Sequence, residues 1–226
     1  MSIILNIDTA SEKAHVSFAR NGELLHTLTS GSQKEHASFL QSAIQELVQI
    51  TGVHLTQLDA VAVTAGPGSY TGLRVGFSSA KGLCYALNKP LISIGTLEVL
   101  TASALTLFPP VTNEEWYCPM MDARRMEVFT ALYKPDLTVQ LAPCPVILNS
   151  SSFENELSQK SIIFFGSGAA KWQSVCNHPN ALFKNVTLLP GSMSKHSNML
   201  FEKKIFTELA YSEPLYLKEF QTVINN

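Results

Sequence analysis

Charged residues are scarce in this sequence. Asp, Glu, Lys and Arg together make up 15% of the 226 residues, and the formal net charge is −2. Soluble domains carry roughly 25% charged residues on average. A chain with so few charges leaves apolar area on its surface, so we expect part of that surface to be covered by another protein. The absence of a Lys- or Arg-rich run argues against a protein that grips nucleic acid alone.

Motifs for metals, redox chemistry and hydrolysis are also missing. The four cysteines form no C-x-x-C pair, and the six histidines show no i, i+4 spacing. We therefore expect reduced thiols and no metal site. There is no G-x-S-x-G or H-E-x-x-H motif. No apolar run is long enough for a membrane span or a signal peptide, which predicts a cytoplasmic protein without membrane contact.

The first half of the chain reads as three strands followed by alternating helices and strands. Asn21-Gly22 is a hairpin turn, Ser32–Glu35 matches a capping box, and Gly52 is a helix stop. Leu40, Ala43, Ile44, Leu47 and Val48 share one face of the first helix. The predicted strands span 2–8, 14–20, 23–29, 59–65 and 90–94, and the predicted helices run from the capping box to Gly52 and over 70–87 and 96–107.

After Pro109-Pro110, which marks a linker, the pattern starts again. Strands are predicted over 116–122, 127–133, 137–148 and 161–165, with Pro143 and Pro145 placing the third of them at a sheet edge. Helices are predicted over 153–159 and 193–211. This order predicts an α/β protein with an actin-like (ASKHA, ribonuclease H-like) fold, in two similar lobes that span residues 1–108 and 114–226.

Two acids end corresponding strands of these lobes. In actin-like ATPases an acid at the position of Asp8 approaches the nucleotide's metal and phosphates, but no glycine follows Asp8, so we favour the cap of a turn. Asp122 precedes two arginines and is expected to be ion-paired at the cleft. Gly166 and Gly168 could lie against adenine or simply join a strand to a helix, and we favour the joint. Together the four residues form a possible vestigial nucleotide cleft.

A glycine-rich segment, residues 65–76, stands at a strand-to-helix junction, where helix N–H groups can hold an anion. It matches neither a Walker loop nor a dinucleotide fingerprint. Within the helix that follows, Gly72, Gly76 and Ala80 recur every four residues and share one face. Glycine inside a helix costs about 1 kcal/mol relative to alanine. Another backbone must therefore approach this face closely, and either the protein's own sheet or a partner's helix could supply it.

Four segments in order resemble the bacterial TsaB (YeaZ) family. They are I-L-N-I-D-T-A at residues 4–10, A-V-T-A-G-P-G-S-Y-T-G-L-R-V-G at 62–76, M-D-A-R-R-M-E-V-F at 121–129 and E-P-L-Y-L-K at 213–218. The resemblance implies a non-catalytic scaffold or activator, with no cofactor and no catalytic residue. The reaction would be threonylcarbamoylation of the adenosine beside the anticodon in tRNAs that read codons beginning with A.

The resemblance also implies partners. These are the paralogous transferase TsaD, which carries an H-x-x-x-H metal pair that this sequence lacks, the ATPase TsaE, and a second copy when the chain is alone; tRNA would be met only through the complex. The first-lobe helices would form the interface. The interface residues expected there are Glu35, His36, Phe39, Leu40, Ala43, Gly72, Val75, Gly76, Ser79, Ala80 and Leu83. The alternative function is an actin-like ATP-dependent phosphotransferase that uses Asp8, Asp122 and 166–168 around a nucleotide.

Overall fold

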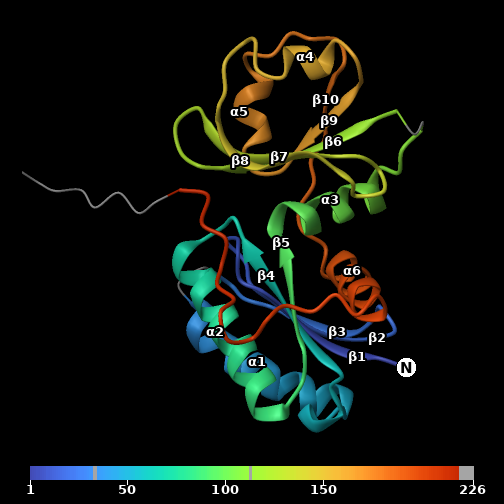
Figure 1. Cartoon of the computed structure of the whole chain (residues 1–226). Helices are drawn as coiled ribbons and strands as arrows, with labels where there is room; N and C mark the ends of the chain where they lie inside the picture. The colour runs from blue at the N-terminus through green and yellow to red at the C-terminus, as the bar shows by residue number, and fades with distance from the viewer. Residues whose placement is uncertain (33–34, 112–113, 219–226) are drawn as a thin grey trace, which may run out of the picture.

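Two mixed α/β lobes, stacked one on the other, make up the molecule (Figure 1). The computed structural model describes residues 1–32, 35–111 and 114–218. Each lobe is built on a five-stranded sheet, and the helix α3 lies between the two lobes, where it packs against β4 and β5 of one sheet and against β6 of the other. Within the described ranges, no helix combines the length and the apolar character needed to cross a bilayer.

The first sheet begins with the expected antiparallel meander. Asn21 and Gly22, with φ of 51° and 82°, form the hairpin turn between the second and the third strand. The strand order is β3-β2-β1-β4-β5, with β4 and β5 parallel to β1. The strands span Ile3–Asp8 (β1), His15–Arg20 (β2), Glu23–Thr29 (β3), Ala60–Gly66 (β4) and Leu91–Gly95 (β5).

Helices cover both faces of this sheet. Leu5, Ile7 and Val63 point to the face covered by α1 and α2, whereas Ile4 and Ala62 point to the face covered by α3 and α6. The strands β1 and β4 are therefore apolar on both sides, as their sequences predict. The helices span His36–Thr51 (α1), Tyr70–Leu87 (α2), Thr96–Leu107 (α3) and Pro190–Glu202 (α6), with a short 3-10 helix η2 at Leu55–Gln57.

The first helix keeps its predicted end but not its predicted cap. It stops at Gly52, whose φ of 68° ends the helix in the left-handed region. Its N-cap is Glu35, which makes no side-chain capping bond. Part of the expected Ser32–Glu35 capping box, residues 33 and 34, lies outside the described residues.

The second lobe repeats the first. Its sheet has the order β10-β9-β6-β7-β8, which places β6, β7 and β8 where β1, β2 and β3 stand in the first sheet. The predicted repeat is therefore present, and the proline-bearing β8 is at the edge as expected. Its elements span Trp116–Asp122 (β6), Glu127–Tyr133 (β7), Val139–Ile147 (β8), Glu154–Leu157 (α4), Ile162–Phe165 (β9), Ala169–Gln173 (α5) and Ala181–Phe183 (β10).

The chain leaves the second lobe after β10, and this corrects the expected division at 114–226. It returns to the first lobe, where Met193 of α6 packs with Ile4 and Ile92. The helix expected over 193–211 ends at Glu202, because the chain beyond it runs extended along the first lobe. Thr207 bridges to Leu91 there. We call residues 203–218 the tail segment.

Candidate functional site

Two cavities open at the junction between the lobes, and Ser11, Glu12 and Met121 line both of them. The first has a volume of about 830 Å³ and the second about 550 Å³. The other residues of the first cavity are Ala10, Ser32, Gly68, Ser69, Asp122, Arg124 and Phe129. The junction is therefore hollow where the sequence predicts a cleft.

Asp8 lies beneath this junction and lines neither cavity. Its side chain is fully buried, and Oδ1 accepts hydrogen bonds from the Ala10 N–H (3.0 Å) and the Thr64 hydroxyl (2.8 Å). Oδ2 has no partner among the described residues. Burial raises the pKa of the Asp8 carboxyl group above its usual range, against the opposing effect of these two hydrogen bonds. This geometry agrees with the turn-cap interpretation.

Asp122 is ion-paired at the strand end, but not with the arginines beside it. Its Oδ1 lies 3.2 Å from Lys171 Nζ of α5 and accepts a hydrogen bond from the Arg124 N–H. Arg124 and Arg125 both have positive φ, so the chain turns sharply after β6. Glu127 Oε2 pairs with Lys218 of the tail segment. The expected ion pair is present, with a partner that is distant in sequence.

The glycines of the late strand-to-helix joint are explained by close packing on β6 and β7. A Cβ at Gly166, which has φ of 94°, would lie 2.5 Å from the Met120 carbonyl oxygen, and one at Gly168 would lie 2.6 Å from Val128 Cγ1. Of the four residues predicted for a nucleotide cleft, only Asp122 and Gly166 line a cavity, and they line different ones. The structure does not gather the four around one space.

The glycine-rich loop after β4 packs onto the turn after β1. A Cβ at Gly68 would lie 2.4 Å from the Ala10 carbonyl oxygen, and that same oxygen accepts a hydrogen bond from the Ser69 N–H. Ser69 Oγ in turn accepts from the Gly72 N–H at the start of α2. The first turn of α2 is thus capped by the serine at its own N-terminus.

The small-residue stripe of α2 faces the protein's own sheet. A Cβ added to Gly72 would lie 2.2 Å from the Thr9 carbonyl oxygen, and one added to Gly76 would lie 2.2 Å from Thr9 Oγ1. Thr9 Oγ1 donates a hydrogen bond to the Gly72 carbonyl oxygen at 2.7 Å, so strand end and helix touch directly. The sequence left open whether the protein's own sheet or a partner's helix lies against this stripe, and the structure shows that it is the sheet.

The expected interface residues therefore divide into two groups. Those whose side chains are buried inside the lobe, and which cannot touch a partner, are His36, Leu40, Ala43, Gly72, Gly76 and Ala80. Those that remain exposed or half-buried are Glu35, Phe39, Val75, Ser79 and Leu83. The correction follows from helix geometry, because a stripe that recurs every four residues marks one face without telling which face is outside.

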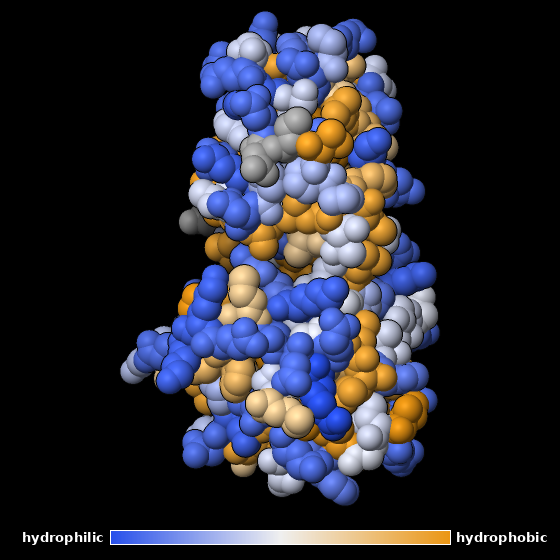
Figure 2. Space-filling model, turned by 90° about the vertical axis from the view of Figure 1, so that its right-hand side faces the viewer, coloured by the Kyte–Doolittle hydropathy of each residue, from blue (hydrophilic) through white to orange (hydrophobic). Residues whose placement is uncertain are grey.

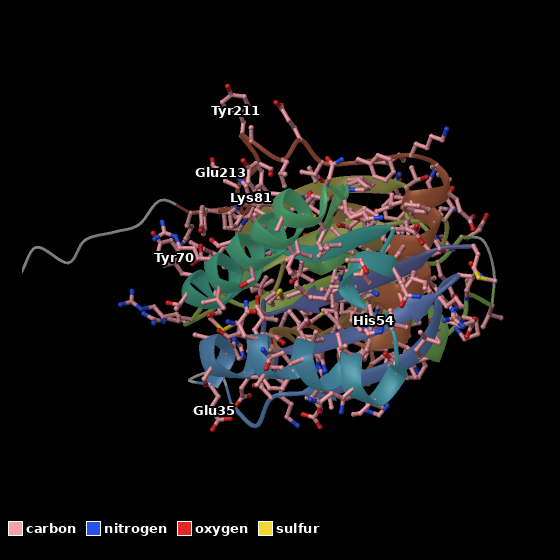
Figure 3. All side chains as sticks on the ribbon, turned by 90° about the horizontal axis from the view of Figure 1, so that it is seen from below. Glu35, His54, Tyr70, Lys81, Tyr211 and Glu213 are labelled. Carbon is pink, nitrogen blue, oxygen red and sulfur yellow. The ribbon has the colours of Figure 1, made fainter. Side chains whose placement is uncertain are left out.

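The outer face of α1 and α2 carries little free charge. Gln41 of α1 donates a hydrogen bond to Ser79 of α2 across the seam. The guanidinium of Arg74 lies 4.0 Å from the centre of the Tyr70 ring, and Lys81 donates hydrogen bonds to two carbonyls of the tail segment. Figure 3 shows Lys81 beside the tail segment and Glu35 at the opposite side, at the start of α1.

The tail segment is a part of this surface that sequence reasoning missed. The Leu215 N–H donates to the Ala65 carbonyl at the end of β4, and the Tyr216 hydroxyl accepts from Arg74 Nε. The Tyr216 ring also packs on Tyr70, with ring centres 5.1 Å apart. The sequence singles out the E-P-L-Y-L-K segment, residues 213–218, but does not predict where in the fold it lies.

No group of three or more potential metal-binding side chains is found among the described residues.

The chain is similar to known proteins across most of its length. The family model for TsaD, a tRNA N6-adenosine threonylcarbamoyltransferase, matches residues 27–147. A tRNA threonylcarbamoyladenosine biosynthesis protein TsaB from Haemophilus influenzae is 33% identical over 126 residues, which cover 56% of this chain and 51% of that protein. TsaB from Escherichia coli is 25% identical over 222 residues, covering 95% and 94%. The matched part thus spans about half of the first of these relatives.

A solved structure shares the whole fold. A Pseudomonas aeruginosa protein described as similar to peptidase YeaZ has a TM-score of 0.82 at 22% identity, and the match covers 96% of this chain and 100% of that one. At this level of identity the likeness concerns the fold alone. It extends over both lobes, including the return of the chain to the first lobe.

Proposed function

Since this chain belongs to the TsaB (YeaZ) family, we propose that it is an accessory subunit for threonylcarbamoyl transfer to tRNA. The acceptor is the adenosine beside the anticodon in tRNAs that read codons beginning with A. A TsaD-like transferase performs the transfer and a TsaE-like ATPase joins the pair, all in the cytoplasm. The chain itself catalyses no step and meets tRNA only through this complex. The family match is the observation that carries the proposal.

The residues of the lobe junction support a non-catalytic role. The sequence lacks an H-x-x-x-H pair, the metal-binding feature expected of the transferase. Asp8 lines neither cavity, and Asp122, which lines the larger one, is paired with Lys171. Neither acid is therefore both unpaired and at the wall of the larger cavity.

We propose the outer face of α1 and α2 as the transferase contact. Phe39, Val75, Ser79 and Leu83 are half-buried there, and Gly82 is exposed beside them. Low charge at such a face suits a protein partner, because few charges need to be desolvated. A transferase of the matching family would have a similar lobe, so two like faces can pair around an approximate twofold axis. The same face would serve a homodimer.

Reconstitution tests this role. Purified transferase and ATPase, tRNA and threonylcarbamoyl-adenylate are mixed with or without this chain, and the modified nucleoside is measured by mass spectrometry. We expect modification only when the chain is present, and none from the chain alone. Transfer by the chain alone, or equal transfer without it, contradicts the proposal.

Gly82→Arg tests the surface. Gly82 is exposed, and a Cβ there has no atom within 4 Å, so the variant should fold normally. Because residues 75, 79, 82 and 83 share one helix face, the new side chain would stand between the two proteins. We expect at least about a hundredfold weaker transferase binding by calorimetry. Ala170→Arg, an exposed helical position of the second lobe, is the matched control and should bind normally.

The alternative is an ATP-dependent phosphotransferase, and the cavities at the lobe junction are the observation that favours it. A nucleotide that binds the folded state raises the melting temperature as its concentration increases. On our proposal Mg-ATP leaves the melting temperature unchanged, and Asp8→Asn still supports tRNA modification. A clear thermal shift with Mg-ATP that Asp8→Asn abolishes would favour the kinase instead.

A further inference from the structure

The second cavity at the lobe junction is lined by both polar and apolar side chains. Its volume of about 550 Å³ lies in the range of small-molecule sites. The polar side chains that line it are Ser11, Glu12, Lys13, His15, Thr29, Thr96, Ser167 and Thr187, and the apolar ones are Leu100, Met121, Val186 and Leu188. Both lobes and the connection leading to α6 contribute to it. Figure 2 shows apolar side chains gathered in a band at this level of the molecule.

Thr96, at the wall of this cavity, has a hydroxyl group without a partner. It is the first residue of α3 and only 3% exposed. The structure describes every hydroxyl-bearing residue of α3, and Thr96 is the one whose hydroxyl group makes no hydrogen bond. Thr101 donates to the Leu97 carbonyl, Ser103 to the Val99 carbonyl and Thr106 to the Ala102 carbonyl. A buried hydroxyl without a hydrogen bond is rare, because its desolvation is not compensated.

The start of α3 offers further donors at the same place. Gly95 is the N-cap and supplies no side-chain capping bond, so the first-turn N–H groups depend on other acceptors. The acid of this first turn, Glu98, is directed to His196 of α6, with Oε1 2.8 Å from Nε2. A helix start attracts a negative charge through its dipole. The unpartnered hydroxyl and the start of the helix can therefore both bind a ligand group that accepts hydrogen bonds and carries a negative charge.

The charges of the cavity limit that ligand to a single negative charge. Of the described residues that line it, Lys13 alone carries a full positive charge, and Glu12 opposes it. Burial lowers the pKa of the His15 imidazole, which keeps this ring neutral, although Asp8 acts in the opposite direction. A polyphosphate carries several negative charges, and the positive charge at this cavity is too small to compensate for them. Leu100, Met121 and Leu188 provide contact for an apolar body.

We propose that this cavity binds a small organic monocarboxylate. The carboxylate accepts hydrogen bonds from the Thr96 hydroxyl and the first turn of α3, and the apolar body of the ligand lies against Leu100 and the facing side chains. This site is separate from the partner surface on α1 and α2. Its test uses the purified chain alone, so its outcome does not depend on the role in tRNA modification.

Saturation-transfer NMR tests the site on the wild-type chain with hexanoate and 1-hexanol, and inorganic phosphate, which has no observable proton, is tested by its ability to displace hexanoate. Hexanoate carries both features, 1-hexanol has the apolar body without the charge, and inorganic phosphate has the charge without the body. We expect hexanoate to bind at least about ten times more tightly than 1-hexanol, as a hydrogen bond to a charged group provides, and phosphate not to bind. Equal binding of hexanoate and 1-hexanol, or binding of phosphate as tight as that of hexanoate, overturns the proposal.

Variants assign the binding to Thr96. Thr96→Val should weaken hexanoate binding about tenfold or more and leave 1-hexanol unchanged, whereas Thr96→Ser keeps the hydroxyl and should bind normally. The matched control is Thr101→Val, a buried threonine of the same helix whose hydroxyl is satisfied. Lys13→Met, at an exposed position, is an independent variant that should weaken hexanoate about threefold. Unchanged hexanoate binding in Thr96→Val or in Lys13→Met contradicts the assignment.

Discussion

At the residue scale, three glycines of one helix have different surroundings. Gly72 and Gly76 stand against the end of β1, where the Thr9 backbone and side chain occupy the space of a Cβ. Gly82, two turns further on, faces open space. The helix bears the conformational cost of glycine at all three positions, but only the first two gain close packing in return.

Alanine substitutions distinguish these two kinds of surroundings by their effect on the free energy of unfolding. Gly76→Ala should lower the free energy of unfolding by about 1–3 kcal/mol, because its Cβ would press on Thr9 Oγ1 and overpacking outweighs the gain in helix propensity. Gly82→Ala should raise it by up to about 1 kcal/mol. Urea denaturation measures both. Equal changes in the free energy of unfolding of the two variants would mean that the contact with Thr9 does not limit the size of the side chain at position 76.

Asp8 predicts a dependence on pH. A carboxyl group whose pKa is raised on folding contributes stability when it is protonated, and this contribution is lost as the pH rises through the pKa in the folded state. In Asp8→Asn, Oδ1 can accept the same two hydrogen bonds. We expect the stability of the variant relative to wild type to increase as the pH rises from the acid range towards neutrality. A stability difference that stays constant over this range, measured by urea denaturation, would contradict a raised pKa of the buried Asp8 carboxyl group.

At the element scale, α6 and the tail segment tie distant parts of the chain together. The helix docks on the first sheet partly through polar side chains, with Ser197 Oγ donating to Asn6 Oδ1 at 2.6 Å and Ser2 Oγ donating to Asn198 Oδ1 at 2.5 Å. These buried hydrogen bonds fix the position of α6, because shifting the helix would leave their polar groups unsatisfied. The tail segment then crosses α2, and Lys218 reaches Glu127 of the second lobe.

Lys81 is the anchor of the tail segment on α2. Its Nζ donates to the carbonyls of Ala210 (3.2 Å) and Ser212 (2.9 Å) at a half-buried position. We expect Lys81→Met to lower the free energy of unfolding by about 1 kcal/mol, since solvent screens part of these bonds. Proteolysis of the tail segment should become faster. Lys195→Met, at an exposed position of α6, is the control, and cleavage of both variants at the wild-type rate would show that Lys81 does not hold the tail segment.

At the scale of the whole molecule, the matching lobes predict self-association. Lobes that resemble a transferase family can pair with a second copy through the same face that meets the transferase. We expect a concentration-dependent dimer in sedimentation velocity. Gly82→Arg should remain monomeric, and Ala170→Arg should dimerise as the wild type does. A dimer that persists in Gly82→Arg would place the self-contact on another surface.

Much of the fold could be predicted from local sequence. The bounds of α2 at Tyr70–Leu87 and of β7 at Glu127–Tyr133 agree with the prediction, because apolar periodicity and turn residues such as Asn21-Gly22 act over a few residues. The internal repeat was visible for the same reason. The very short β10 was missed, and α5 was anticipated only as the helix after the Gly166–Gly168 joint, without its bounds, since three to five residues give no usable period.

The sequence by itself determined the order of the strands and helices, the family and the residues that share a helix face. Only the tertiary structure decided that the stripe of Gly72 and Gly76 meets the end of β1, and that Asp122 pairs with Lys171. It also decided that α6 returns to the first lobe and that Thr96 is left without a partner at a cavity. The physical reason is that periodicity is a local property, whereas these contacts join residues far apart in the chain, and no pattern within one segment states what its face will meet.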